Sequence, residues 1–241
     1  MLKIVAAVRR KPGMTHAEFI DYIVNVHGQI ARAEPVRLKR YIQNHVDDGA
    51  FGSKHSAAYA MPFHRDNVTE LYFDSAADMA ATFGHEYTRT VVGPDGANFA
   101  ELSTNEATLT NETIVSPPTD RANTVKIMHF LVAHSVEQVA VTQDTWGEAH
   151  DRAMRQAPLF AAALRGTTRS DAIAPPPGSP VAAYFGGEGR APLAVIASHW
   201  VAQANASTFR DYDDAISASG CYDPERSYYL VTKEVEIFPG A

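Results

Sequence analysis

Apolar and polar positions divide the first half of the chain into segments of two kinds. Four short runs are either rich in apolar, β-branched and aromatic residues or alternate between polar and apolar positions. They predict strands at residues 3–10, 38–46, 68–74 and 106–115. After the first run, apolar side chains recur at helical spacing at Phe19, Ile23, Val26 and Ile30, which predicts an amphipathic helix. Residues 76–83 predict a second helix.

Capping and turn residues mark the ends of these segments. Thr15 is an N-cap candidate, and Glu18 three residues later completes a capping box. Pro35 ends the first helix, and Ser75 caps the second. The sequence Gly-Pro-Asp-Gly at residues 93–96 predicts a break in the chain. The resulting order, β-α-β-β-α-β, is that of a ferredoxin-like unit.

The same order restarts after a proline-containing segment. Strands are predicted at residues 125–134, 164–173, 193–201 and 228–238, and helices at 144–160 and 204–218. Three residue pairs lie 123 positions apart: Lys3 and Lys126, His27 and His150, Pro35 and Pro158. We interpret the chain as a tandem repeat with units at residues 1–116 and 125–241, joined by a linker at 117–124.

The first predicted strand is apolar on both faces, with Ile4 and Val8 on one face and Val5 and Ala7 on the other. Helices can cover only one face of each four-stranded sheet, so the other face needs a second sheet. We therefore expect an α+β fold in which the two antiparallel sheets pair, which also protects their edges.

Composition and charge narrow the functional class. The 241 residues are 45% hydrophobic and 20% charged, with a formal net charge of −7 and no basic run, which argues against a nucleic-acid or membrane partner. The single cysteine, Cys221, has no disulfide partner in the chain, and no signal peptide or membrane-spanning run is evident. We expect a cytoplasmic protein.

The motifs of the first half resemble a known family. The run RRKPGMTHAEFIDYIVNVHG, followed by RYIQNH and ELYFDS, is similar to an EthD-type domain of the dimeric α/β-barrel superfamily. The resemblance is specific over the first 75 residues and weak in the second half. It implies two ferredoxin-like sheets paired into a barrel, here as an intramolecular pseudo-dimer that is also compatible with a homodimer of pseudo-dimers.

His27 is the first catalytic candidate because it lies at the margin of the apolar helix stripe. The resemblance implies that a histidine of this helix lines a pocket between helices and sheet, where an imidazole suits proton transfer. The alternative is a packing histidine. On residues 38–46, alternation places Tyr41 and His45 on one face and Asn44 on the other, so one set could face His27. Tyr72 could orient a substrate carbonyl or be a core aromatic.

Further candidates lie in the second half and in a long loop. His150 has Trp146 one turn before it, and Trp146 would either floor a second pocket or fill it. His199 and Trp200 lie on the strand that corresponds to that of Tyr72, where the pair could line the second pocket. The predicted loop at residues 47–66 mixes aromatics with histidines, and its candidate binding residues are Phe63 and His64.

The sequence favours an enzyme without a cofactor that performs proton-transfer chemistry on a small apolar carbonyl, aromatic or polyketide-like compound. Dehydration, cyclisation, isomerisation and decarboxylation, the work of a lyase or isomerase, all fit this description. No metal-binding spacing occurs among the ten histidines. The resemblance leaves two alternatives open: a non-catalytic accessory protein of an oxygenase system, and a haem protein.

Overall fold

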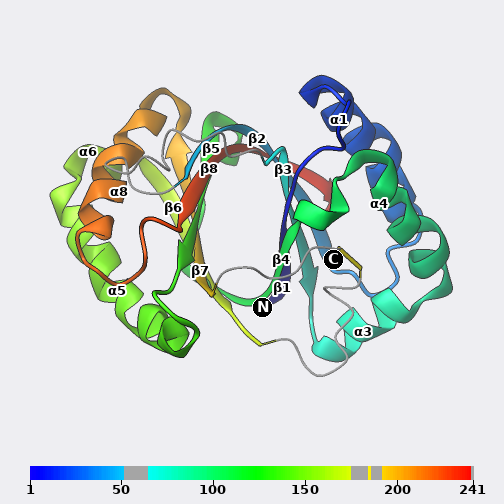
Figure 1. Ribbon diagram of the computed structural model, residues 1–241. Helices are drawn as coiled ribbons and strands as arrows, with labels where there is room; N and C mark the ends of the chain where they lie inside the picture. Colours follow the sequence, from blue (N-terminus) through cyan, green and yellow to red (C-terminus); the bar gives the residue numbers. More distant parts are fainter. Residues whose placement is uncertain (52–64, 175–183, 186–191, 240–241) are drawn as a thin grey trace.

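Eight antiparallel strands close into a barrel in the part of the chain that the computed structural model describes, residues 1–51, 65–174, 184–185 and 192–239. The strands are β1 Leu2–Val8, β2 Arg40–Phe51, β3 Asn67–Phe73, β4 Glu106–Ser116, β5 Thr124–Val132, β6 Leu164–Ala172, β7 Leu193–Ala202 and β8 Tyr228–Phe238 (Figure 1). Their order around the barrel is β1-β3-β2-β8-β5-β7-β6-β4. The strands of each half are therefore contiguous, and the halves join where β2 pairs with β8 and β4 pairs with β6.

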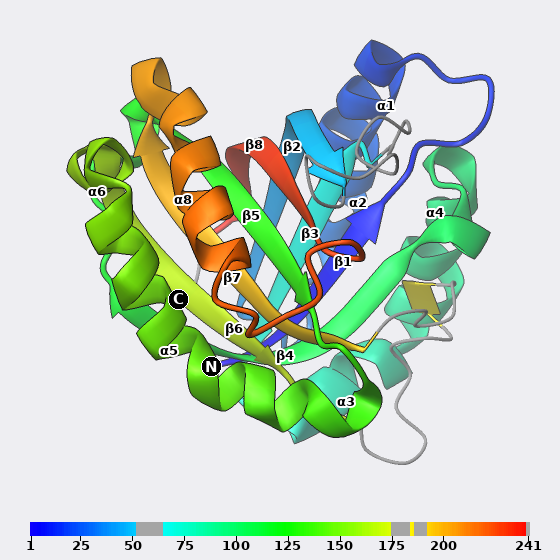
Figure 2. The same cartoon turned by 60° about the vertical axis from the view of Figure 1, so that its left-hand side comes forward.

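The helices of the two halves lie on opposite sides of the barrel (Figures 1 and 2). The first half contributes α1 His16–Tyr22, α2 Gly28–Ala33, α3 Ala76–Gly84 and α4 Gly93–Phe99, with π-helical turns at Ile23–His27 and Thr88–Val92. The second half contributes α5 Val139–Gln156, α6 Pro158–Ala163 and α8 Phe209–Ser217. Short 3-10 turns lie at Leu102–Thr104, Arg121–Asn123, Val136–Gln138 and Gln203–Thr208. None of the described helices is long and apolar enough to cross a membrane.

The structure confirms the α+β fold and the predicted helix caps. The Thr15 side chain accepts a hydrogen bond from the Glu18 backbone, and the Glu18 carboxylate accepts one from the Thr15 backbone, as a capping box requires. Ser75 caps α3 through the backbone N–H of Asp78. Both helices therefore begin where their local sequences predict.

The predicted break at residues 93–96 is wrong. The chain stays helical from the π-turn at Thr88–Val92 directly into α4. Pro94 lies in the first turn of α4, directly after the π-turn. The Gly-Pro sequence thus continues the helix, and this places Asp95 on a helix that packs beside the first one.

Both faces of the first strand are buried, as the sequence predicts. Ile4 and Val8 pack under the helices of the first half. Val5 and Ala7 face the barrel interior, where they pack against residues of both halves, including Phe130 of β5. The barrel interior is thus a packed layer shared by the two halves.

A buried ion network lies beside this apolar layer inside the barrel. Lys3 and Lys126 are 0% and 1% exposed, and both bind Glu70, which is 0% exposed. Burial alone would raise the pKa of Glu70, but the two lysines outweigh it, so the pKa of this carboxyl lies well below its usual value. Lys3 also binds Glu112, and Lys126 binds Glu234, so the two lysines have similar surroundings.

Candidate active site

A cavity lies between the sheet and the helices of the first half. About 870 Å³ of space free of protein atoms lies within it, and this figure includes open solvent at its mouth. Aromatic rings form much of its wall: Tyr41, Phe73, Phe83, Phe99, Tyr184 and Phe185. Among the described lining residues, Glu34 and His27 are the only ones with an acidic or basic side chain. The cavity is therefore suited to an uncharged, largely apolar molecule.

His27 lines this cavity and is held from behind by a carboxylate. Its Nδ1 lies 2.9 Å from Oδ2 of Asp95 on α4. The Asp95 carboxylate also accepts hydrogen bonds from the Tyr22 hydroxyl at 2.7 Å and from the Asn98 amide at 2.9 Å. The bond to His27, followed by those to Tyr22 and Asn98, outweighs burial and lowers the pKa of Asp95 to about 2. Asp95 is therefore ionised near neutral pH.

The carboxylate on Nδ1 sets the orientation and tautomer of the His27 ring. An ionised carboxylate can only accept, so Nδ1 carries a proton, and in the neutral ring the lone pair lies on Nε2. Within the described residues, Nε2 has no hydrogen-bond partner. The ring lies 4.7 Å from the ring of Phe99 and is 13% exposed. The arrangement is that of an oriented base at the wall of an apolar cavity.

Two π-turns build this side of the cavity. The first ends at His27, and the N–H of Gly28 donates to the carbonyl of Ile23 five residues back. The second ends before Gly93, whose N–H donates to the carbonyl of Thr88 in the same way. A Cβ on Gly28 would lie 3.0 Å from the Ile23 oxygen, so glycine suits this tight turn. Such turns inside α-helices are frequently found at functional sites.

Tyr41 lines the cavity from β2, and its hydroxyl is oriented by neighbours on the sheet. Gln43 Nε2 donates to the carbonyl of Ile23 at 2.7 Å, which fixes its amide orientation, and also to the Tyr41 hydroxyl at 3.0 Å. A hydrogen bond from the Thr69 hydroxyl also acts on Tyr41, and both this bond and the one from Gln43 lower the pKa of Tyr41. Burial outweighs both bonds and raises the pKa of Tyr41 to about 12. With two bonds accepted, the hydroxyl proton of Tyr41 remains available to a ligand.

His45 is linked to Tyr41 but is absent from the cavity lining. Its Nε2 lies 3.1 Å from Oε1 of Gln43, whose amide nitrogen bonds Tyr41. Burial, together with the charges of His16 and Lys233, lowers the pKa of His45 to about 4. His45 is therefore neutral at physiological pH. Its Nε2–H donates a hydrogen bond to Gln43, and Gln43 in turn donates one to the Tyr41 hydroxyl at the cavity.

Asn44 and Tyr72 lie on the opposite face of the sheet. The Asn44 amide bonds Glu70 at 3.0 Å inside the barrel, and the Tyr72 ring lies 5.3 Å from the Lys3 ammonium. Alternation along the strands explains both positions, because Tyr41 and Leu71 face the helices. The structure thus brings Tyr41 to the cavity with His27 and separates Tyr72 and Asn44 from it.

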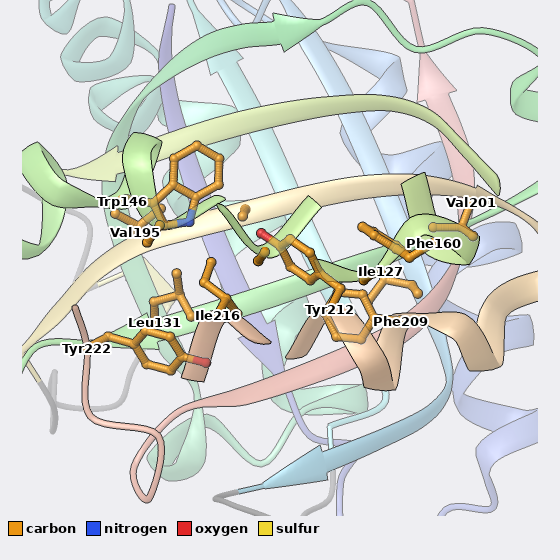
Figure 3. Close-up of a cluster of buried hydrophobic side chains, with 14 of the residues drawn as sticks. Ile127, Leu131, Trp146, Phe160, Val195, Val201, Phe209, Tyr212, Ile216 and Tyr222 are labelled. Carbon is orange, nitrogen blue, oxygen red and sulfur yellow. The ribbon is translucent and has the colours of Figure 1, made fainter. Parts of the chain in front are cut away.

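In the second half, aromatic side chains fill the space between helices and sheet (Figure 3). Trp146 stacks on His150 with ring centroids 4.7 Å apart, and His150 Nδ1 bonds the Tyr212 hydroxyl at 2.7 Å. His199 packs 5.1 Å from the ring of Tyr212 and 5.7 Å from that of Phe160. Two roles were predicted for Trp146. The structure favours the one in which its side chain fills the pocket over the one in which it forms the floor of a pocket.

His199 and Trp200 face opposite sides of their strand. His199 packs under the helices, whereas Trp200 lies beneath Lys126 inside the barrel, with the ammonium 4.9 Å from its ring. Burial first, and then the neighbouring His150 and His129, hold the pKa of His199 well below its usual value. The two residues therefore do not share a pocket. Phe63 and His64 lie outside the described residues.

Three polar residues of the site escaped sequence reasoning. Asp95 was hidden by the glycine-proline pattern around it, and only its packing beside His27 reveals it. Asn67 and Asn105 line the cavity at the start of β3 and just before β4. Each carries a buried amide oxygen without a hydrogen-bond partner in the described structure. A polar residue at a strand end is too common to single out from sequence alone.

No cluster of three or more His, Cys, Asp or Glu side chains suited to a metal ion occurs among the described residues. Around the cavity itself, the described lining offers His27 and Glu34 as possible ligands, and Nδ1 of His27 already bonds Asp95. The site therefore presents one free imidazole nitrogen and one carboxylate.

Comparison with known proteins agrees with this architecture. Residues 11–103 match the family model of the EthD domain. No curated protein has a significantly similar sequence. The EthD match covers α1, the first π-turn, β2, β3 and α4, and thus both His27 and Asp95.

Solved structures resemble the chain over nearly its whole length. An anthrone oxidase-like protein aligns over 100% of this chain and 96% of its own, with a TM-score of 0.55 and 9% identity. A proposed monooxygenase of Fusobacterium nucleatum aligns over 100% and 95%, with a TM-score of 0.52 and 6% identity. A proposed chlorite dismutase aligns over 98% and 95%, with a TM-score of 0.50 and 9% identity. At such identities the likeness concerns the fold alone, and the family likeness is that of residues 11–103 to the EthD domain.

Proposed function

We propose that the chain is an enzyme that transfers protons on a small, uncharged carbonyl or aromatic compound bound in the cavity of the first half. The observation that carries this proposal is the pairing of His27 with Asp95 at the wall of an apolar cavity. Isomerisation, cyclisation, dehydration and decarboxylation all begin or end with such a transfer, and none requires a bound cofactor.

In the proposed mechanism, Nε2 of His27 removes a proton from carbon or oxygen of the substrate. The imidazolium that forms stays paired with the Asp95 carboxylate 2.9 Å from Nδ1, so the positive charge is stabilised where it appears. The same nitrogen then returns the proton at another position or to a leaving group. The surrounding aromatic wall makes the environment of the reacting atoms largely apolar.

Tyr41 is the proposed partner of His27. Its hydroxyl accepts from Gln43 and Thr69, and its own proton is free to bond a substrate carbonyl. That bond strengthens as negative charge develops on the carbonyl oxygen, which stabilises an enolate. Tyr41 thus takes the orienting role that the sequence suggested for Tyr72.

The proposed scaffold is a duplicated ferredoxin-like unit, with boundaries at residues 1–116 and 125–241 and a linker at 117–124. The β-α-β-β-α-β order of each half and the similar surroundings of Lys3 and Lys126 support this reading. In this view the first unit carries the chemistry and the second completes the barrel. Its His150 is buried against Trp146 and Tyr212, consistent with a structural role.

Hydrogen–deuterium exchange tests the proposed proton transfer directly, whichever of these reactions follows it. Small cyclic ketones and hydroxylated aromatic compounds are incubated with the protein in D2O, and exchange is followed by NMR. We expect the protein to accelerate exchange for part of this set, and His27→Ala to abolish the acceleration. Because two structural neighbours bear names of oxidative enzymes, oxygen consumption is followed in parallel. Acceleration that survives His27→Ala would overturn the assignment.

A ligand carrier is the competing function from another class. A carrier would bind members of the same set tightly without accelerating exchange, and His27→Ala would then change affinity alone. The oriented His27–Asp95 pair favours the enzyme, because storage of an apolar ligand does not need a carboxylate held against a histidine ring.

Haem fits the cavity poorly. Its propionates carry two negative charges, and the described lining contains no Lys or Arg to pair with them. We therefore place no haem in the site. The absorption spectrum of the purified protein checks this point directly, since a Soret band would replace the present proposal.

A further inference from the structure

Two buried amide oxygens in the cavity wall have no hydrogen-bond partner. Asn67 and Asn105 are 2% and 4% exposed, both line the cavity, and Oδ1 of each is unpaired in the described structure. A buried acceptor without a partner costs about 1–3 kcal/mol, so native proteins rarely keep one without a reason. Of the residues with such atoms, Asn67 and Asn105 line this cavity, where a bound ligand would complete them.

The hydrogen bonds of each amide fix which atom it offers. Asn105 Nδ2 donates to the carbonyl of Phe185 at 2.8 Å, and a carbonyl can only accept, so Oδ1 is the free end. Asn67 Nδ2 donates to the Thr69 hydroxyl at 3.0 Å, and Thr69 in turn bonds Tyr41. Both residues therefore offer acceptors, and the matching groups on a ligand must be hydrogen-bond donors.

The rest of the wall restricts the body and charge of the ligand. Phe83 lies 4.6 Å from Tyr184 and 6.3 Å from Phe185 in edge-on geometry, so the wall presents aromatic faces and edges. The lining within the described residues lacks Lys and Arg, which disfavours carboxylates and phosphates. An uncharged aromatic molecule with hydroxyl groups satisfies all of these features.

We propose that the cavity selects neutral hydroxylated aromatic compounds, and that Asn67 and Asn105 are its specificity-determining residues. Oδ1 of each accepts a hydroxyl proton of the ligand, while Tyr41 donates to a ligand oxygen. This inference rests on the same cavity as the proposed function and specifies its substrate class, but it does not depend on the proton transfer by His27.

Binding of paired probes tests the inference. The isomers of dihydroxynaphthalene and their dimethyl ethers have the same ring system, but only the former can donate hydrogen bonds. Affinities are measured by calorimetry for the wild-type protein and for Asn67→Ala, Asn105→Ala and the double variant. We expect at least one diol to bind roughly tenfold or more tightly than its ether, and each single substitution to remove roughly tenfold of diol affinity. Affinity for the ether should change little, so the loss is coupled to the ligand hydroxyl.

Asn44→Ala is the matched control. Asn44 is also buried with an unpaired Oδ1, but it lies inside the barrel and bonds Glu70. We expect it to lower thermal stability without changing diol affinity. Equal affinity of the wild-type protein for diols and ethers would overturn the inference. So would equal losses of diol affinity in Asn67→Ala, Asn105→Ala and Asn44→Ala.

The outcome is separable from that of the proposed function. If diols bind selectively through Asn67 and Asn105 while no compound undergoes accelerated exchange, the recognition stands and the enzyme proposal fails. If exchange depends on His27 but the asparagine variants do not discriminate diols from ethers, the enzyme proposal stands and this inference fails. Binding of ethers alone counts against the inference, because the amide oxygens would then remain unpaired.

Discussion

His27 Nδ1 and Asp95 Oδ2 lie 2.9 Å apart, although the two residues are separated by 68 positions in the sequence. The pair joins the π-turn after α1 to the first turn of α4. It leaves Nε2 of the imidazole without a partner among the described residues and makes Asp95 the residue that decides the tautomer of His27. The predictions about activity follow from this pair.

Asp95→Asn should lower the rate of ligand proton exchange without preventing binding. The amide cannot stabilise the imidazolium and permits the wrong tautomer, so we expect a loss on the order of a hundredfold to ten-thousandfold, as for other positioned acid–base groups. Because His27 and Asp95 act as a unit, the double variant His27→Ala/Asp95→Asn should lose little more than either single variant. Tyr22→Phe, which removes one donor to Asp95, serves as the control with a small loss.

Tyr41→Phe should weaken binding of carbonyl-containing ligands while keeping the ring in place. One neutral hydrogen bond corresponds to roughly a tenfold change in affinity. Tyr72→Phe removes the same atom from the opposite face of the same sheet, where Tyr72 lies beside Lys3. Calorimetry should therefore show weaker binding for Tyr41→Phe and unchanged binding for Tyr72→Phe, and a reversed pattern would place the ligand inside the barrel.

His150→Leu should leave activity intact and lower stability. His150 is buried, stacks on Trp146 and bonds Tyr212, and both of these residues belong to the hydrophobic core of the second half (Figure 3). Removing the ring leaves the Tyr212 hydroxyl without its partner, and we expect a destabilisation of about 1–3 kcal/mol by urea unfolding. Activity lost from His150→Leu at temperatures where the protein is folded would show that the second half also carries chemistry.

Glu70→Gln should destabilise the barrel strongly. Glu70 binds both Lys3 and Lys126, so the neutral amide leaves two buried ammonium groups short of a counter-charge. We expect a loss of about 3–5 kcal/mol, as for other broken buried pairs. Glu112→Gln removes a partner of Lys3 alone, at a side chain that is 13% exposed, and should cost less. Denaturant midpoints of the two variants provide the comparison.

Stability should fall as pH drops below about 6.5, the ordinary histidine pKa. Burial lowers the pKa of His129 to about 3 and also lowers those of His150 and His199, so these residues stay neutral when folded but take up protons when unfolded. The unfolded state then binds more protons, and stability increases with pH between the folded and unfolded pKa values. Each histidine should contribute about 1.4 kcal/mol per pH unit in this window.

Urea unfolding at a series of pH values measures this slope. His129→Leu should reduce it by the contribution of one proton. A slope that His129→Leu does not alter would mean that this ring is protonated in the folded state.

Local sequence was sufficient for most of the elements. The capping box at Thr15 and Glu18 depends on residues three positions apart, and Pro35 follows the helix closely. Alternation on β2 correctly separated Tyr41 and His45 from Asn44, because side chains of a strand point to opposite faces whatever the surrounding fold. His27 was found because the helix stripe places it at the margin of the core.

The tertiary structure alone decided which of these residues form a site. Gly93 and Pro94 predict a break locally, but the preceding π-turn continues the helix and carries Asp95 to His27. His27 and His150 occupy similar helix positions, yet one lines a cavity and the other is stacked in a filled core. That difference depends on the volume of side chains brought in from distant elements, such as Tyr212 on α8. Sequence periodicity specifies the face on which a residue lies, whereas packing between distant segments determines whether that face meets a cavity, a counter-charge or another ring.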